Sequence, residues 1–173
     1  TITTVTRNFA FDNCDVKDTS AVLNFLASFT TTTTDNASDG LTITRNRIIS
    51  TVATGAARMA TIAGNLDNAF IADNYYSAKT TGTGATIACG SKSLTNLLYL
   101  RNRLNIVGTT AGNTVLISTS SGTNSGMISE TTMHGLSQTP VLATASSGFV
   151  YGANNLWSDT ADLQGYLVPA ADT

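Results

Sequence analysis

The chain has 173 residues, of which 42% are hydrophobic and only 12% are charged, and its formal net charge is −2. An average soluble domain is about a quarter charged, but disordered chains are both highly charged and poor in apolar residues, so this composition argues against disorder. Nine Lys and Arg against eleven Asp and Glu leave no basic patch for nucleic acid, and no apolar stretch approaches the ~18 residues of a membrane helix.

The length and the two cysteines bound the organisation further. A chain of this size is expected to form one domain, residues 1–173. Cys14 and Cys89 are too few for a disulfide framework and show no metal-ligand spacing. We therefore expect both thiols to be small core side chains, and we expect no metal and no cofactor.

The first 56 residues are the least regular part of the sequence. Residues 19–29 come closest to a helical pattern, but their position matches a strand of the repeat that follows. The polar residues 30–40 are expected to form a turn that bulges outward. Residues 1–56 are thus predicted to form an irregular first coil.

From residue 41 onward the sequence repeats every 28 residues. An apolar run, a charged residue and an asparagine recur together at residues 41–46, 69–74 and 97–102, and the next step falls on Glu130. A second set of runs begins at Met59, Ile87, Val115 and Val141, and a third follows each asparagine at residues 48–49, 75–76, 104 and 133. The runs favour Val, Ile, Thr, Tyr and Phe, and turn residues separate them, so each repeat is predicted to hold three short β-strands.

Three short strands stacked at a fixed period predict an all-β fold, a parallel β-helix. This solenoid would have about five to six coils with three short strands per coil. Within the single domain we expect regular coils over residues 57–140. A shortened last coil and a C-terminal tail would occupy residues 141–173.

The recurring asparagines predict a structural ladder. Asn13, Asn46, Asn74 and Asn102 are placed at the same bend between two strands. Asparagine tolerates the left-handed backbone that such a bend needs. Adjacent coils lie ~4.8 Å apart, so stacked amides can donate to and accept from one another.

The residues before these asparagines alternate in sign: Asp12, Arg45, Asp73 and Arg101. In a stacked register, opposite charges face each other along this charge ladder. Each exposed pair would contribute about 0.2–1 kcal/mol. The larger effect would be on register, because a slip by one coil brings like charges together.

The repeated unit Ile71-Ala-Asp-Asn74-Tyr-Tyr76 resembles that of the single-stranded right-handed parallel β-helix of the pectate-lyase-like superfamily and of bacteriophage tailspikes. The resemblance extends from about residue 8 to residue 157, and the texture rich in Thr, Ser, Ala and Gly is similar to that of phage virion proteins. The sequence departs from the pattern at Glu130, where the asparagine is missing. This fold hosts many activities, so the resemblance alone does not assign one.

No catalytic set emerges from the repeats. The resemblance implies that an enzyme of this fold would use carboxylates on an outward strand face. Glycoside hydrolysis needs two carboxyl groups that flank the scissile bond. Glu130 and His134 are close in sequence and could act as acid and base, but a role as ordinary polar surface residues is the simpler interpretation. The cluster Asp12, Asp15 and Asp18 could bind Ca²⁺, although a solvated turn is the simpler interpretation.

One strand set is predicted to form an oligomer interface. With Met59, Ile87, Val115 and Val141 pointing inward, alternation turns an apolar set outward, and that set needs a cover. Its members are Ala60, Ile62, Ala88, Leu116 and Leu142. Self-association would cover them, and the resemblance to phage β-helix proteins implies a homotrimer. A shift of one residue would instead place them in the core.

A glycan contact is the remaining candidate site. Tyr75 and Trp157, with the neighbouring Arg47 and Arg103, could stack on and hydrogen-bond a sugar. Core or interface packing is the alternative role for these aromatic residues.

These observations predict a non-enzymatic structural component of a bacteriophage virion, namely a tail fibre or spike segment or a capsid-decorating protein. It would lie on the particle surface as a homotrimer, contacting other virion proteins and host surface polysaccharide. The alternatives are a polysaccharide-degrading lyase or hydrolase of the tailspike type, and a carbohydrate-binding adhesin module. No nucleic acid and no membrane is expected as a partner.

Overall fold

The computed structural model describes residues 7–18, 24–29, 38–50, 58–62, 65–80, 85–89, 93–108, 115–118, 123–136, 141–144, 148–159 and 164–166. Every regular element in these ranges is a β-strand. The same ranges contain no helix with the length and apolar character needed to cross a membrane. The predicted all-β class is therefore confirmed for the described part of the chain.

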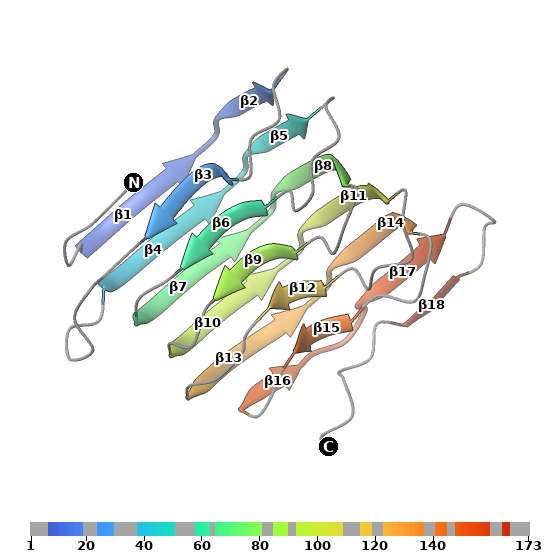
Figure 1. The fold of residues 1–173 in the computed structure, drawn as a ribbon. Helices are drawn as coiled ribbons and strands as arrows, with labels where there is room; N and C mark the ends of the chain where they lie inside the picture. The colour runs from blue at the N-terminus through green and yellow to red at the C-terminus, as the bar shows by residue number, and fades with distance from the viewer. Residues whose placement is uncertain are drawn as a thin grey trace.

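The described strands form three sheets, and within each sheet they follow chain order (Figure 1). Sheet I contains β1 (Arg7–Asp12), β4 (Ser38–Thr44), β7 (Leu66–Ala72), β10 (Leu94–Leu100), β13 (Asn124–Ser129) and β16 (Phe149–Tyr151). Sheet II contains β2 (Asp15–Asp18), β5 (Arg47–Ser50), β8 (Tyr75–Thr80), β11 (Arg103–Gly108), β14 (Thr132–Leu136), β17 (Leu156–Asp159) and β18 (Gln164–Tyr166). Sheet III contains β3 (Asn24–Phe29), β6 (Arg58–Ile62), β9 (Ala85–Cys89), β12 (Val115–Ser118) and β15 (Val141–Thr144).

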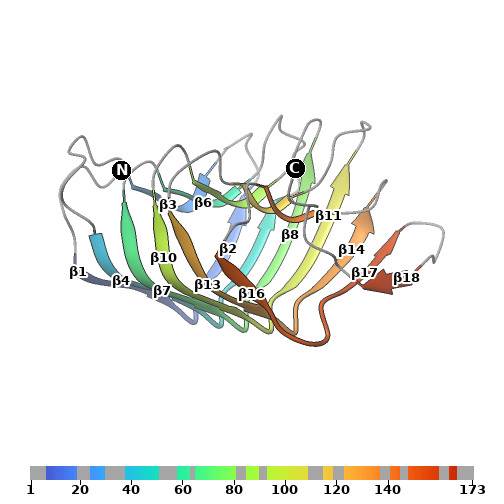
Figure 2. The same ribbon diagram turned by 90° about the horizontal axis from the view of Figure 1, so that it is seen from below.

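The chain visits the three sheets in turn, so each strand pairs with the strand three places further along the sequence. All of these pairings are parallel, and only β17 and β18 pair antiparallel among the described strands. Sheets I and II meet at a sharp bend, and sheet III lies across from it (Figure 2). This arrangement is consistent with a parallel β-solenoid.

The pairing register confirms the 28-residue period in the middle of the chain. Leu66 lies opposite Leu94, and Tyr75 lies opposite Arg103. The next step is one residue longer, since Leu98 lies opposite Met127 after a register shift. The last step is shorter, because Met127 lies opposite Val150.

The core lies on the inner side of sheets I and II. Alternation along each strand sends every second side chain inward. In sheet I one such column is Ile43, Ile71, Tyr99 and Ile128, and in sheet II another is Ile48, Tyr76, Leu104 and Met133. All of these side chains are at most 1% exposed, so the columns stack large apolar groups repeat upon repeat.

The irregular first repeat follows the same strand order as the rest. Residues 24–29 form strand β3 rather than a helix, as their position in the repeat indicates. The outward turn predicted over residues 30–40 ends earlier than expected, because residues 38–40 already belong to β4. Residues 30–37 lie outside the described part of the chain.

The register of sheet III differs from the expected one. Ile87 lies opposite Ala60 and Ile117, not opposite Met59 and Val115. Strands this short, with apolar residues at adjacent positions, give alternation too little contrast to fix the register from the sequence.

The predicted interface set does not form one outward column in this register. Ala60 and Ile62 lie opposite Ile87 and Cys89, whereas Ala88 lies opposite Thr61 and Ser118. Ser118 lies opposite both Ala88 and Thr144. Leu116 is two residues before Ser118, and Leu142 is two residues before Thr144, so both leucines alternate in step with Ala88. The set is thus divided between the two alternating positions of the sheet. The side chains of sheet III lie outside the described part of the chain.

Candidate functional site: a polar surface beside a buried asparagine ladder

The bend between sheets I and II is built around stacked asparagine side chains. Asn46, Asn74 and Asn102 are at most 2% exposed. Nδ2 of Asn46 donates to Oδ1 of Asn74 at 3.0 Å, and Nδ2 of Asn74 donates to Oδ1 of Asn102 at 2.9 Å. The same acceptor oxygens take the backbone N–H groups of Asn46 and Asn74.

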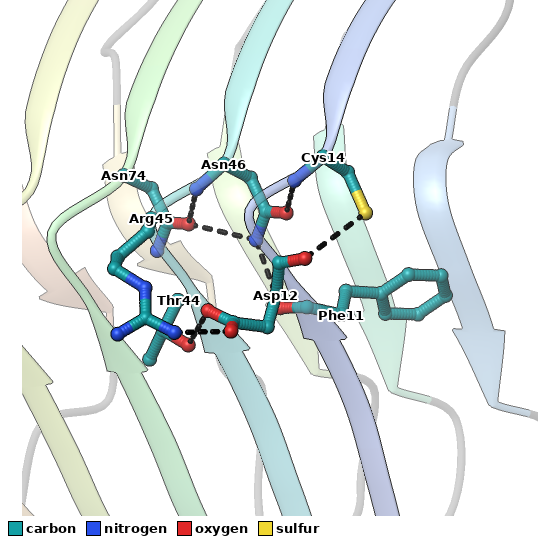
Figure 3. Close-up of polar contacts among 7 residues, drawn as sticks. All are labelled: Phe11, Asp12, Cys14, Thr44, Arg45, Asn46 and Asn74. Atoms are coloured by element: carbon teal, nitrogen blue, oxygen red, sulfur yellow. Dashed lines mark hydrogen bonds and ion pairs between the residues drawn. The ribbon is translucent and has the colours of Figure 1, made fainter.

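Each ladder amide also binds the backbone of the repeat before it. Nδ2 of Asn46 donates to the carbonyl of Phe11, and Nδ2 of Asn74 donates to that of Ile43. Figure 3 shows the first of these contacts together with the Asn46–Asn74 pair. At the turn, backbone N–H and C=O groups are buried but are not paired with a neighbouring strand. The hydrogen bonds from the asparagine side chains satisfy these groups, which would otherwise destabilise the fold.

The ladder begins and ends differently from the expectation. Asn13 is not in it: the N–H of Cys14 donates to Oδ1 of Asn46 at 2.9 Å, so Cys14 takes the first position (Figure 3). Beyond Asn102 the column continues with Thr131, whose N–H donates to Oδ1 of Asn155 at 3.1 Å. The first Asp-Asn pair is offset by one residue, since Asp12 lies opposite Thr44.

The left-handed backbone belongs to the residue before each ladder position, not to the asparagine itself. Arg45, Asp73, Arg101 and Glu130 have φ angles of 54°, 59°, 51° and 54°. Non-glycine residues rarely adopt this conformation. The side chain at this position is exposed in each case, which leaves it open to form ion pairs along the edge of the bend.

The charge ladder is made of two pairs. Nε and Nη2 of Arg101 donate to the two carboxylate oxygens of Asp73 at 2.8 and 2.9 Å. Arg45 pairs with Asp12, and Oδ1 of Asp12 also accepts the hydroxyl of Thr44 at 2.7 Å (Figure 3). Hydrogen bonds from Arg101 lower the pKa of Asp73, and those from Arg45 and Thr44 lower the pKa of Asp12.

The outward face of sheet II brings three of the four predicted glycan-contact residues together. Arg47 lies opposite Tyr75, and Tyr75 lies opposite Arg103, so the three occupy one column on β5, β8 and β11. Adjacent strands in a sheet are ~4.8 Å apart. Tyr75 therefore lies between two arginine positions and is 38% exposed, while the guanidinium of Arg47 donates to Asp15 on β2.

A second outward column runs beside the first. Ser77 lies opposite Asn105, and Asn105 lies opposite His134. Nδ2 of Asn105 donates to Oγ of Ser77 at 3.4 Å. Tyr75, Arg103, Leu104, Asn105 and His134 line a hollow of about 370 Å³. In the sequence His134 stands out beside Glu130, but its spacing from Asn105, one repeat apart, is the signal that places it here.

The fourth predicted contact residue does not join this surface. Trp157 lies opposite Met133, which belongs to the buried column of sheet II. Trp157 therefore occupies an inward position of the sheet, whereas Tyr75 occupies an outward one. The side chain of Trp157 lies outside the described part of the chain.

The predicted acidic residues are spread over the surface rather than gathered. Glu130 occupies the left-handed position of the turn after β13, so it does not share a strand with His134. Asp15 pairs with Arg47 and Asp12 with Arg45, which leaves the proposed Ca²⁺ cluster divided between two arginines. The described residues contain no group of three or more His, Cys, Asp and Glu that could hold a metal ion.

Sheet I carries an outward apolar column that was not among the predicted sites. Phe70 lies opposite Leu98, Leu98 opposite Met127, and Met127 opposite Val150. Leu98, Met127 and Val150 are 44%, 40% and 61% exposed, and a hollow of about 560 Å³ adjoins them. Phe70 and Leu98 are one 28-residue period apart, but Met127 and Val150 join the column only through the longer and the shorter step that follow.

Comparisons of the chain with protein-family models, with curated proteins and with solved structures gave no significant match.

Proposed function

We propose that the chain is a non-catalytic structural component of a bacteriophage particle, a tail fibre or spike segment or a capsid-decorating protein. It would be built as a single-stranded right-handed parallel β-helix of about five to six coils, with three strands per coil. The observation that carries this proposal is the buried Asn46–Asn74–Asn102 ladder, which uses its polar groups to hold repeats in register. Such a rod presents long, flat, regular surfaces suited to attachment and display.

The ion pairs and hydrogen bonds of the carboxylates support a non-catalytic role. Asp12, Asp15 and Asp73 are paired with arginines. Asp67 accepts hydrogen bonds from Thr95 and Asn96, both at 2.8 Å. Glycoside hydrolysis needs one carboxyl group to donate a proton and a second on the other side of the bond. The carboxylates named here instead stabilise neighbouring repeats.

We further propose that the particle component is a homotrimer. The apolar column Phe70, Leu98, Met127 and Val150 supports this state better than the originally expected set on sheet III. Exposed apolar residues in one continuous line are uncommon on monomeric proteins. Three copies arranged around an axis parallel to the stack would cover the same column on each chain.

The polar surface of sheet II supports contact with host surface polysaccharide. Tyr75 supplies an apolar ring face, and Arg103 and Asn105 beside it supply hydrogen bonds. On a virion this face would point away from the particle, while the ends of the rod would contact other capsid or tail proteins.

The proposal is tested by incubating the purified protein with a panel of bacterial capsular polysaccharides and lipopolysaccharides. We expect no new reducing ends and no unsaturated sugars, and we expect capsid or tail genes beside the gene that encodes the chain. Cleavage products would instead establish the alternative, a polysaccharide-degrading tailspike enzyme. Neighbouring genes for cell-surface adhesion would favour an adhesin module.

A further inference from the structure

The hollow on sheet II gathers four kinds of polar or aromatic group from three adjacent strands. Tyr75 comes from β8, Arg103 and Asn105 from β11, and His134 from β14. Tyr75 lies opposite Arg103 and Asn105 lies opposite His134, so the set spans only two strand spacings, or about 10 Å. An aromatic ring, a guanidinium, an amide and an imidazole thus share one shallow site.

Arg103 differs from the other arginines at the edge of the bend. Arg45, Arg47 and Arg101 each form an ion pair with an aspartate. Within the part of the chain that the structure describes, no carboxylate pairs with Arg103, although its side chain is exposed. Its planar guanidinium therefore remains available to bind a carboxylate in the bidentate mode.

The neighbouring groups complement such a contact. Asn105 uses Nδ2 toward Ser77, which leaves Oδ1 and one N–H of the amide for a ligand. The exposed ring of Tyr75 offers a flat apolar face beside the guanidinium. Together these groups match a ring that carries a negative charge on one side, hydroxyls around it and an apolar C–H face.

We propose that this hollow binds an acidic sugar residue of an extended polysaccharide. The sugar carboxylate would pair with Arg103, its apolar face would lie on Tyr75, and its hydroxyls would bond Asn105 and His134. The inference rests on the proposed function, because it assigns a ligand class and named residues to the surface on which glycan contact was proposed.

The charge around the site favours this ligand over a nucleic acid. A nucleic acid carries a phosphate charge every few ångströms and needs many unpaired cations. Here Arg47, the nearest other arginine in the column, is already paired with Asp15. A site with one unpaired arginine and one aromatic ring suits a polymer with a single charge per sugar.

The test is isothermal titration calorimetry of the purified protein with two sets of oligosaccharides of equal length. Short oligogalacturonates carry one carboxylate per sugar, and maltooligosaccharides carry none. The variants are Arg103→Gln, Arg103→Lys and Tyr75→Leu. Lys17→Gln is the matched control, because Lys17 is an exposed cation on the same face of sheet II but three strands away. Far-ultraviolet circular dichroism verifies that each variant keeps the fold.

We expect the acidic oligomers to bind and the neutral ones to bind much more weakly. Arg103→Gln should weaken binding about tenfold or more, Arg103→Lys should weaken it less, and Lys17→Gln should leave it unchanged. Equal binding of both oligomers, no binding of the acidic ones, or an unchanged affinity in Arg103→Gln would each overturn the inference. Mass analysis of the recovered oligomer keeps the two proposals apart, since shortened products would contradict the non-catalytic function whatever the affinity.

Discussion

The side-chain amide of Asn74 donates to Oδ1 of Asn102 at 2.9 Å, although 28 residues separate them in the sequence. Both side chains are almost completely buried. The contact therefore joins the period of the sequence to the spacing of the strands: a shift of either repeat would leave buried polar groups without partners.

Replacing Asn74 with alanine should destabilise the protein by about 3 kcal/mol. The change removes the acceptor of the Asn46 amide and N–H, and the donor to the Ile43 carbonyl, and each buried group left unpaired costs about 1–3 kcal/mol. Urea unfolding followed by circular dichroism measures the effect. Asn105→Ala is the control, since the Asn105 amide makes a long hydrogen bond of 3.4 Å to Ser77 and its loss should cost under about 1 kcal/mol. Equal effects would show that the ladder does not stabilise the stack.

Replacing Thr131 with asparagine should stabilise the protein by about 1 kcal/mol. Thr131 occupies the ladder position after Asn102, and its N–H already bonds Asn155. An amide there would offer Oδ1 to Asn102 and a donor to the sheet I carbonyls, as Asn74 does toward Asn46 and Ile43. A lower urea midpoint for the variant would show that the column cannot take an asparagine at this step.

Acid should weaken the stack through Asp73 and Asp12. Arg101 lowers the pKa of Asp73, and Arg45 with Thr44 lowers that of Asp12, both from an ordinary value of 3.8. A pKa that is lower in the folded state contributes stability above the unfolded value and loses it as the pH falls through the folded value. Urea midpoints should therefore drop as the pH falls below about 4. The drop should be shallower in Asp73→Asn, and an identical slope in this variant would contradict the assignment.

Gly126 should not tolerate a side chain. Its φ of 140° lies in a region that L-residues rarely adopt, and a Cβ there would come within 2.1 Å of the Leu97 carbonyl oxygen. Because that contact is with backbone, Gly126→Ala should cost about 3 kcal/mol or more. The neighbouring Ser125→Ala loses only the acceptor of the Asn96 N–H and should cost about 1 kcal/mol. A mild effect at Gly126 would mean that β10 and β13 can move apart.

Light scattering should give a mass about three times the chain's 17.9 kDa. Leu98→Asp should reduce this mass to that of one chain, because an unpaired charge would be buried in the trimer contact. Since Leu98 is 44% exposed within one chain, the variant should keep its circular dichroism spectrum. Leu116→Asp tests the originally expected interface on sheet III. A trimer that survives Leu98→Asp but not Leu116→Asp would place the contact there instead.

The sequence predicted the repeat well because its strongest signals are periodic. The 28-residue spacing of Asn46, Asn74 and Asn102 gave the strand order and the stacked amides without knowledge of the packing. The first repeat was misaligned by one residue, because Asp12-Asn13 imitates the Asp73-Asn74 pair. In the structure Asp12 instead lies opposite Thr44 and reaches diagonally to Arg45.

Register and facing direction were harder to predict than strand position. In sheet III, runs such as Val115-Leu-Ile117 are apolar at every position, so alternation cannot show which residues pair. The candidate binding surface was predictable in part. Arg47, Tyr75 and Arg103 follow the ladder asparagines directly, but Asn105 and His134 join them only through the pairing of β11 with β14.

The most direct test of the stacked, asparagine-held solenoid is a nuclear Overhauser experiment on side-chain amide protons in the isotopically labelled protein. We expect cross-peaks between the amide groups of Asn46 and Asn74 and between those of Asn74 and Asn102, given Nδ2–Oδ1 distances of 3.0 and 2.9 Å. If all three resonances are assigned and neither cross-peak is found, the repeats are not stacked in this register and the asparagines do not form a ladder.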